Sequence, residues 1–174
     1  IEGLIYYSEY REGKEILFSN GIIEIIIDRL TKEKDENVIN SLLLLLNELL
    51  HSQDGSKLAI KNKIISVLLL YITHDNINIR LNIFRNLSSI SMCDEGKESC
   101  IEEKDDLINK CIIHIKSEMN KDFSIVNFNY MEELTRFLIG ISILKRGKEE
   151  LYKHKGIELG LDFLKLYKEK QADD

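Results

Sequence analysis

One short junction recurs along the chain at a nearly constant spacing. A glycine is followed by lysine, directly or after one serine, at Gly13, Gly55, Gly96 and Gly147. The steps between these glycines are 42, 41 and 51 residues (55 − 13, 96 − 55 and 147 − 96). Leucine lies nine residues before each glycine, at Leu4, Leu46, Leu87 and Leu138. A period of this length is typical of repeat arrays, in which each unit buries its apolar face against the next.

The residues before each glycine follow the periodicity of an amphipathic helix. Apolar side chains lie thirteen, nine and six residues before the glycine, and these offsets place them on one helical face. Asparagine, a favoured N-cap residue, lies eighteen residues before three of the glycines, at Asn37, Asn78 and Asn129. The pattern therefore predicts a capped core helix of about four turns in each unit.

Each unit is expected to contain two further helices. A short helix begins near the glycine, and an apolar second helix follows a tight turn, as in residues 21–30 and 63–72. β-Branched residues favour strands, but the fixed place of these isoleucine-rich stretches in the period favours helices. The glycine is expected to let the chain turn sharply between one core helix and the next short helix.

These observations predict one all-α array over residues 1–174. Its expected parts are the end of a truncated repeat (1–11), two complete repeats (12–53 and 54–94), a repeat with an insertion (95–145) and a C-terminal partial repeat (146–174). The insertion adds about ten residues near 117–128, because the distance from Gly96 to Asn129 is 33 residues, against 24 and 23 in the preceding units (37 − 13 and 78 − 55). It is either a harmless surface insertion or a partner-contact loop presenting Phe123, Ile125 and Phe128.

Composition excludes several classes of function. The net charge of −6 disfavours nucleic acid as a partner, because phosphate binding depends on clustered lysine and arginine. The three cysteines form no C-x-x-C pair, which indicates a reducing compartment rather than a disulfide framework. No apolar stretch is long enough to span a membrane. We therefore expect a cytoplasmic protein with no membrane partner.

The Gly-Lys junctions invite comparison with a phosphate-binding loop, and the comparison fails. Such a loop needs a glycine five residues before the second one and Ser or Thr after the lysine. The residues at the first position are Ser8, Leu50, Ser91 and Ser142, and no Gly-Lys pair is followed by Ser or Thr. Cys111 and His114 could supply half of a zinc site, but no partner pair accompanies them. We expect no catalytic residues, no cofactor and no metal.

The recurring L-x-x-[IL] and [ED]-G-x-x-x segments, each followed by a turn such as N-G-I or H-K-G-I, resemble the armadillo repeat. The resemblance implies a right-handed α-solenoid of three-helix repeats that acts as a non-catalytic protein–protein interaction scaffold. Residues 80–101 and 137–164 look most like armadillo proteins related to the radial-spoke head. That likeness implies a structural role in a ciliary assembly and an axonemal location. The alternatives are a module of a transport adaptor or myosin chaperone and, in another class, an enzyme or cofactor-binding domain.

Armadillo arrays usually hold extended peptides on their third helices, where a ladder of asparagines clamps the peptide backbone. The corresponding column here is Gly3, Leu45, Asn86 and Phe137, and the chain contains no tryptophan, so a nuclear-import type of clamp is disfavoured. Arg85 and Arg136 occupy the preceding column, and arginine is well suited to carboxylate recognition. The candidate partner-binding groove is formed by Asn82, Arg85, Asn86, Glu133, Arg136 and Phe137. Alternatively, the arginines pair with local glutamates such as Glu132 and Glu133.

The two ends of the chain carry different expectations. The sequence opens inside a core-helix pattern, with Leu4 and Tyr7 in core columns, so we expect further repeats before Ile1. The C-terminal run of Lys, Glu and Asp is typical of a natural stop. The expected partner is a folded protein or an extended peptide. The fragment itself is expected to associate through its N-terminal edge.

Overall fold

A computed structural model describes residues 1–103, 106–120 and 128–173. The described residues contain twelve α-helices and no β-strand, which confirms the all-α fold class. None of these helices is both long enough and apolar enough to pass through a membrane. The isoleucine-rich stretches that could have been strands are helices.

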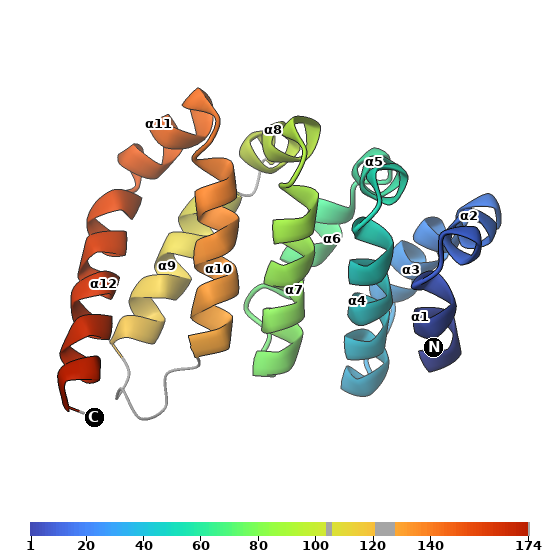
Figure 1. The fold of residues 1–174 in the computed structure, drawn as a ribbon, viewed down its shortest axis with the longest axis horizontal. Helices are drawn as coiled ribbons and strands as arrows, with labels where there is room; N and C mark the ends of the chain where they lie inside the picture. The colour runs from blue at the N-terminus through green and yellow to red at the C-terminus, as the bar shows by residue number, and fades with distance from the viewer. Residues whose placement is uncertain (104–105, 121–127, 174) are drawn as a thin grey trace.

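The helices follow one another in a recurring order along an extended row (Figure 1). The core helices are α1 (Glu2–Ser8), α4 (Glu36–Leu50), α7 (Ile77–Ile90) and α10 (Phe128–Ile141). The short helices that contain the junction glycines are α2 (Arg11–Ser19), α5 (Gln53–Lys61), α8 (Asp94–Glu102) and α11 (Lys145–Lys153). The second helices are α3 (Ile22–Leu30), α6 (Ile64–Leu69), α9 (Leu107–Met119) and α12 (Gly156–Asp173).

The hydrophobic core runs through the array between these helices. The most extensive contacts join α10 to α7 and α7 to α4. Leu46 and Leu87 are fully buried and Leu138 nearly so, as the repeated column predicted. Leu4, in the same column, is 39% exposed, because the described chain has no helix packed before α1.

The N-caps of the core helices lie two residues earlier than the predicted asparagines. The Asp35 carboxylate accepts hydrogen bonds from the Asn37 and Val38 amides, at 2.8 and 3.4 Å. The Asn76 side-chain oxygen accepts from the Asn78 amide at 2.9 Å. Asn37 and Asn78 are therefore in the first turn of their helices rather than at the caps. A polar residue precedes each of them by two positions, and that residue caps the helix instead.

The junction glycines also have a different role from the predicted one. All four lie inside the short helices and none has a positive φ angle, so they do not form the turn. Instead, a Cβ atom at Gly55 would lie 2.1 Å from the Leu49 carbonyl oxygen, and one at Gly96 would lie 1.9 Å from that of Ile90. Gly13 and Gly147 have the same relation to the carbonyls six residues before them. The glycine is needed because the short helix touches the end of the preceding core helix.

In every unit, the residue directly before the second helix has a left-handed backbone conformation. These residues are Gly21, Lys63, Asp106 and Lys155, with φ between 51° and 70°. Glycine adopts this conformation at little cost, whereas other residues adopt it with strain. Three units therefore tolerate strain at this turn, which shows that the packing around it determines the backbone.

The insertion of the third unit partly lengthens its second helix. α9 has 13 residues, against 9 in α3 and 6 in α6. Near its end, the Glu118 carboxylate lies 4.0 Å from the Arg80 guanidinium, which itself lies 5.3 Å from the centre of the Tyr130 ring. These contacts join the extended α9 to α7 and α10. Phe123 and Ile125 fall outside the described residues, and Phe128 is partly buried against the core.

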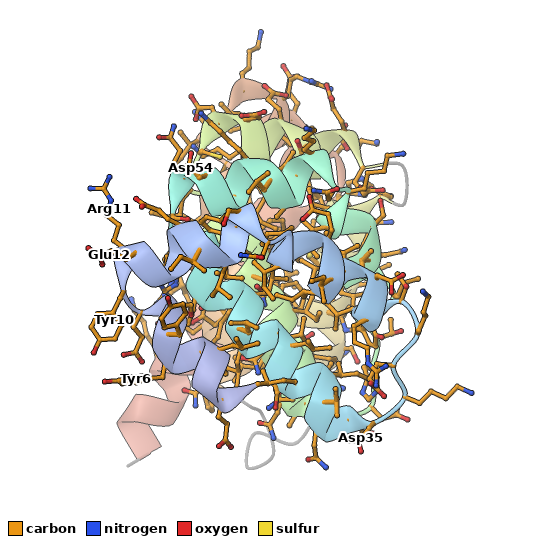
Figure 2. The ribbon with its side chains drawn as sticks, turned by 90° about the vertical axis from the view of Figure 1, so that its right-hand side faces the viewer. Tyr6, Tyr10, Arg11, Glu12, Asp35 and Asp54 are labelled. Atoms are coloured by element: carbon orange, nitrogen blue, oxygen red, sulfur yellow. The ribbon has the colours of Figure 1, made fainter. Side chains whose placement is uncertain are left out.

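The N-terminal end of the array presents aromatic side chains on α1 and the segment after it (Figure 2). Tyr6 and Tyr10 are 62% and 52% exposed and contact one another edge to face, with 5.6 Å between ring centroids. Tyr7, which the sequence placed in a core column, is 41% exposed. This end therefore carries an exposed apolar edge, as expected.

The glycine contact predicts opposite effects of the same substitution at two positions. Gly55→Ala should lower the free energy of unfolding by about 1–3 kcal/mol or more, because the new methyl group overlaps the Leu49 carbonyl. Gly160→Ala, in α12 with no atom within 4 Å, should raise it by about 0.5–1 kcal/mol. Urea denaturation of both variants measures the difference. Equal effects at the two positions would mean that the short helix can move away from the core helix without loss.

Candidate partner-binding groove

A groove of about 760 Å³ opens where α4, α7 and α10 meet the ends of α5 and α8. Its wall includes Arg85 from α7, and Glu133 and Arg136 from α10. His51, at the end of α4, and Lys97, in α8, lie on the other sides. Three of the six predicted groove residues, Arg85, Glu133 and Arg136, thus line one cavity.

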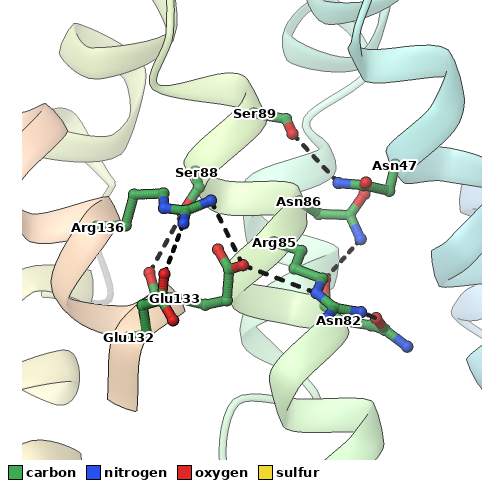
Figure 3. Close-up of polar contacts among 9 residues, drawn as sticks. All are labelled: Asn47, Asn82, Arg85, Asn86, Ser88, Ser89, Glu132, Glu133 and Arg136. Carbon is green, nitrogen blue, oxygen red and sulfur yellow. Dashed lines mark hydrogen bonds and ion pairs between the residues drawn. The ribbon is translucent and has the colours of Figure 1, made fainter. Parts of the chain in front are cut away.

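The two arginines lie on either side of one glutamate (Figure 3). Arg85 Nε is 3.8 Å and Arg136 Nη1 is 3.6 Å from the same Glu133 oxygen. Arg136 also pairs with Glu132 at 2.8 Å, and Arg85 donates to the Asn82 side chain at 3.2 Å. The alternative that these arginines pair with local glutamates is therefore present in the structure. Arg85 and Arg136 remain 41% and 60% exposed, so both can still reach a ligand.

The charge of the groove is opposite to the charge of the chain. Arg85, Lys97 and Arg136 line it with one carboxylate, Glu133, while the whole protein carries a net charge of −6. Lys97 is nearly buried and pairs with Asp94 at 2.7 Å, so the exposed cations are the two arginines. A surface of this kind attracts carboxylate or phosphate groups.

The other three predicted groove residues require a correction. Asn82, Asn86 and Phe137 are 4%, 0% and 0% exposed, and they lie beneath the surface rather than on it. The Asn86 amide donates to the Leu43 carbonyl at 3.0 Å and to the Asn82 carbonyl at 2.7 Å. The Asn82 side chain in turn donates to Asn40 at 2.7 Å. These asparagines join α7 to α4, so they cannot clamp a peptide in this conformation.

Further polar contacts between core helices form the floor of the groove. Asn47 on α4 donates to the Ser89 hydroxyl on α7 at 3.2 Å. Ser88 on α7 donates to the backbone carbonyl of Glu133 on α10 at 3.3 Å. These bonds fix the spacing of the three helices, and therefore the spacing of the arginines that they carry.

The cysteines are placed for packing rather than for nucleophilic chemistry. Burial raises the pKa of the Cys100 and Cys111 thiols well above the usual range, so both stay protonated at neutral pH. Cys93 Sγ accepts a hydrogen bond from the Gly96 amide at 3.4 Å and contacts the Ile90 carbonyl oxygen at 3.6 Å. It caps α8 in the way that Ser52 caps α5.

A second group of polar side chains was missed by the sequence analysis. Asp106, Glu150 and His154 place one potential metal-ligand atom each within 4.8 Å of the others. Glu150 and His154 are four residues apart, which is the spacing of neighbours on one helical face. Asp106 directly precedes α9, in the unit that carries the insertion. No sequence pattern connected Asp106 to Glu150 and His154.

Comparison with known proteins does not identify a family for this chain. The chain matches no protein-family model, and no curated protein is significantly similar to it in sequence.

The buried asparagine contact can be tested separately from binding. Asn86→Ala should lower the free energy of unfolding by about 1–3 kcal/mol, because it removes two buried hydrogen bonds and leaves a small cavity. Asn20→Ala is the matched control, since Asn20 also donates to the carbonyl four residues before it but is exposed. Its effect should stay within about 0.5 kcal/mol. Similar losses in thermal or urea unfolding would argue against a structural role for the Asn86 contact.

Proposed function

We propose that this protein is an α-solenoid of armadillo type that acts as a non-catalytic scaffold for binding another protein. Three recurring features of the array support the proposal: the row of core helices, the junction glycine against the preceding carbonyl, and the left-handed turn before each second helix. Such an architecture buries one continuous core and leaves a long surface for partners.

The observation that carries a binding role is a pair of partly exposed arginines in one groove of an acidic protein. Arg85 and Arg136 share Glu133, and Arg136 also pairs with Glu132, but the two arginines remain 41% and 60% exposed. An acidic segment of a partner can pair with both guanidinium groups without any change in the helices. The proposed ligand is therefore an acidic stretch of protein, either as an extended peptide or on a folded surface.

The cellular setting that we propose rests on the resemblance of residues 80–101 and 137–164 to radial-spoke-head-related armadillo proteins. On this basis the proposed role is structural, within a ciliary or axonemal assembly. A transport adaptor or myosin-chaperone module remains the alternative. Binding of short acidic peptides with the full affinity of the partner would favour the adaptor, whereas a requirement for a folded partner would favour the structural role.

Groove binding should depend on the two arginines together. The double variant Arg85→Glu, Arg136→Glu should weaken an acidic partner by at least about tenfold, because two attractive ion pairs become repulsive contacts. The partner is first captured from native extract, and its affinity is then measured by fluorescence polarisation or calorimetry. The melting temperature should change little, since exposed ion pairs contribute only about 0–1 kcal/mol.

The control carries the same change in charge outside the groove. Arg11 on α2 and Lys32, just after α3, form exposed pairs with Glu15 and Asp28. The double variant Arg11→Glu, Lys32→Glu should bind within about twofold of the wild type at physiological salt. An unchanged affinity in the groove variant would place the interface on another surface, and an equal loss in both variants would indicate a non-specific charge effect.

We also propose that the chain associates with itself through the exposed edge formed by Leu4, Tyr6, Tyr7 and Tyr10. Light scattering should give a mass that rises with concentration, because exposed apolar patches promote association. The variant Leu4→Glu, Tyr7→Glu should be monomeric. Leu70→Glu, at a position 64% exposed in the second unit, should leave the association intact. A wild-type chain that stays monomeric at high concentration would contradict this proposal.

A further inference from the structure

We propose that Asp106, Glu150 and His154 form a binding site for a zinc ion that links α11 to the start of α9. This site lies apart from the groove, and the inference does not depend on the proposed scaffold function. It rests on the positions of three ligand atoms, on the environment of the histidine and on the cavity beside them.

His154 lies from each of the two carboxylates at the spacing of zinc ligands, and all three ligand atoms lie within 4.8 Å of one another. His154 Nε2 lies 3.6 Å from an Asp106 oxygen and 3.5 Å from a Glu150 oxygen. These distances exceed the normal range for N–H···O hydrogen bonds. Ligands bound at 2.0–2.2 Å to a tetrahedral zinc ion lie about 3.3–3.6 Å apart. The two histidine–carboxylate distances therefore leave room for one ion between the ligand atoms.

The Nε2 atom of His154 makes no hydrogen bond, although two carboxylates lie within ion-pair distance of it. The His154 side chain is only 15% exposed, and its Nε2 atom is out of contact with solvent and makes no hydrogen bond. Buried ring nitrogens normally make a hydrogen bond, so one that makes none needs an explanation. A neutral imidazole nitrogen is also the commonest protein ligand for zinc. A bound ion would satisfy this atom.

The secondary structure holds the ligands in place from two elements. His154 is the C-cap residue directly after α11 and Glu150 lies one turn before it, so both ligands come from the same side of the helix end. Asp106 directly precedes α9 but forms no side-chain hydrogen bond with its first turn. An aspartate at this position commonly caps the helix that follows. Here its carboxylate instead lies close to His154.

The chemistry of the ligands favours zinc over magnesium or calcium. Magnesium and calcium prefer six or more oxygen ligands, whereas zinc accepts nitrogen and oxygen together in fourfold coordination. A cavity of about 250 Å³ borders Asp106 and Glu150 and provides space for a water molecule as fourth ligand. Lys153, which is 3.1 Å from the same Glu150 oxygen, is 63% exposed and can turn into solvent when the ion binds. Two carboxylates then balance the charge of the ion.

We expect the bound ion to link the third unit, through the start of α9, to α11. α11 and α9 contact one another directly, and zinc would add a bond network across that contact. Because zinc binds the folded site only, saturating zinc should raise the melting temperature of the chain. A free concentration about 100-fold above the dissociation constant should give a shift of about 5–10 °C.

The test uses residues 1–174 stripped of metal with a chelator and titrated with zinc chloride. Calorimetry and competition with a chromophoric chelator should give one zinc per chain with a dissociation constant of about 1 μM or tighter. His154→Gln and Asp106→Asn should each weaken binding by about 100-fold or more, since each removes a ligand. Asparagine tolerates the left-handed backbone of residue 106, so the second variant keeps the turn. His51→Gln, in the groove, is the control and should bind as wild type.

Cobalt substitution reports the geometry independently of affinity. An intense visible absorption band from the cobalt-loaded chain, lost in Glu150→Gln, is expected for a tetrahedral site. Circular dichroism of every variant confirms that it is folded. Absence of one-to-one binding to the wild-type chain at 100 μM zinc, roughly 100-fold above the expected dissociation constant, would overturn the proposal. So would wild-type affinity in the folded His154→Gln and Asp106→Asn variants.

Discussion

Each short helix lies directly against the last turn of the core helix before it, so closely that only glycine fits at the contact. In the second unit the Ser52 hydroxyl donates to the Leu49 carbonyl at 2.9 Å and accepts from the Gly55 amide at 3.1 Å. One side chain thus serves the end of one helix and the beginning of the next, where backbone groups lack helical partners. Cys93 makes the equivalent contacts in the third unit. This contact fixes the angle between helices, and its recurrence sets the direction of the row.

The contacts between neighbouring core helices include hydrogen bonds from asparagine side chains as well as packed leucines. Asn86 reaches the backbone of α4, and Asn82 reaches the Asn40 side chain, from positions that are almost fully buried. A buried amide is tolerated only where its hydrogen bonds are made, so these contacts hold α7 in one register against α4. The groove is then a consequence of this packing. Its buried asparagines position the helices, and its arginines stay partly exposed at the surface.

The sequence predicted the fold correctly where the spacing of apolar residues reflects which side of a helix is buried. The leucine columns and the helical nature of the isoleucine-rich stretches followed from periodicity, which reflects the face that each helix buries. It was less accurate for polar residues, because an asparagine at a cap, in a buried seam or on the surface looks the same in sequence. For this reason the predicted caps were wrong, since Asp35 and Asn76 cap the helices, and Asn86 lies in the interior rather than on the groove surface. The approach of Asp106 to His154 depends on how two units pack, and no local spacing encodes it.

The charge distribution explains why binding at the groove would cost the fold little. Outside it, Arg146 bridges Glu98 and Glu102 at 2.9 Å each, so that cation is matched by two carboxylates. In the groove, Glu133 lies between two arginines, at 3.6 and 3.8 Å, and Arg136 also pairs with Glu132 at 2.8 Å. Glu133 is only 15% exposed, but both pairs are long and the arginines are 41% and 60% exposed, so the pairs contribute only about 0–1 kcal/mol to stability. A partner carboxylate could therefore pair with one guanidinium group while Glu133 stays paired with the other. The buried asparagine contacts beneath the arginines would then stay unchanged.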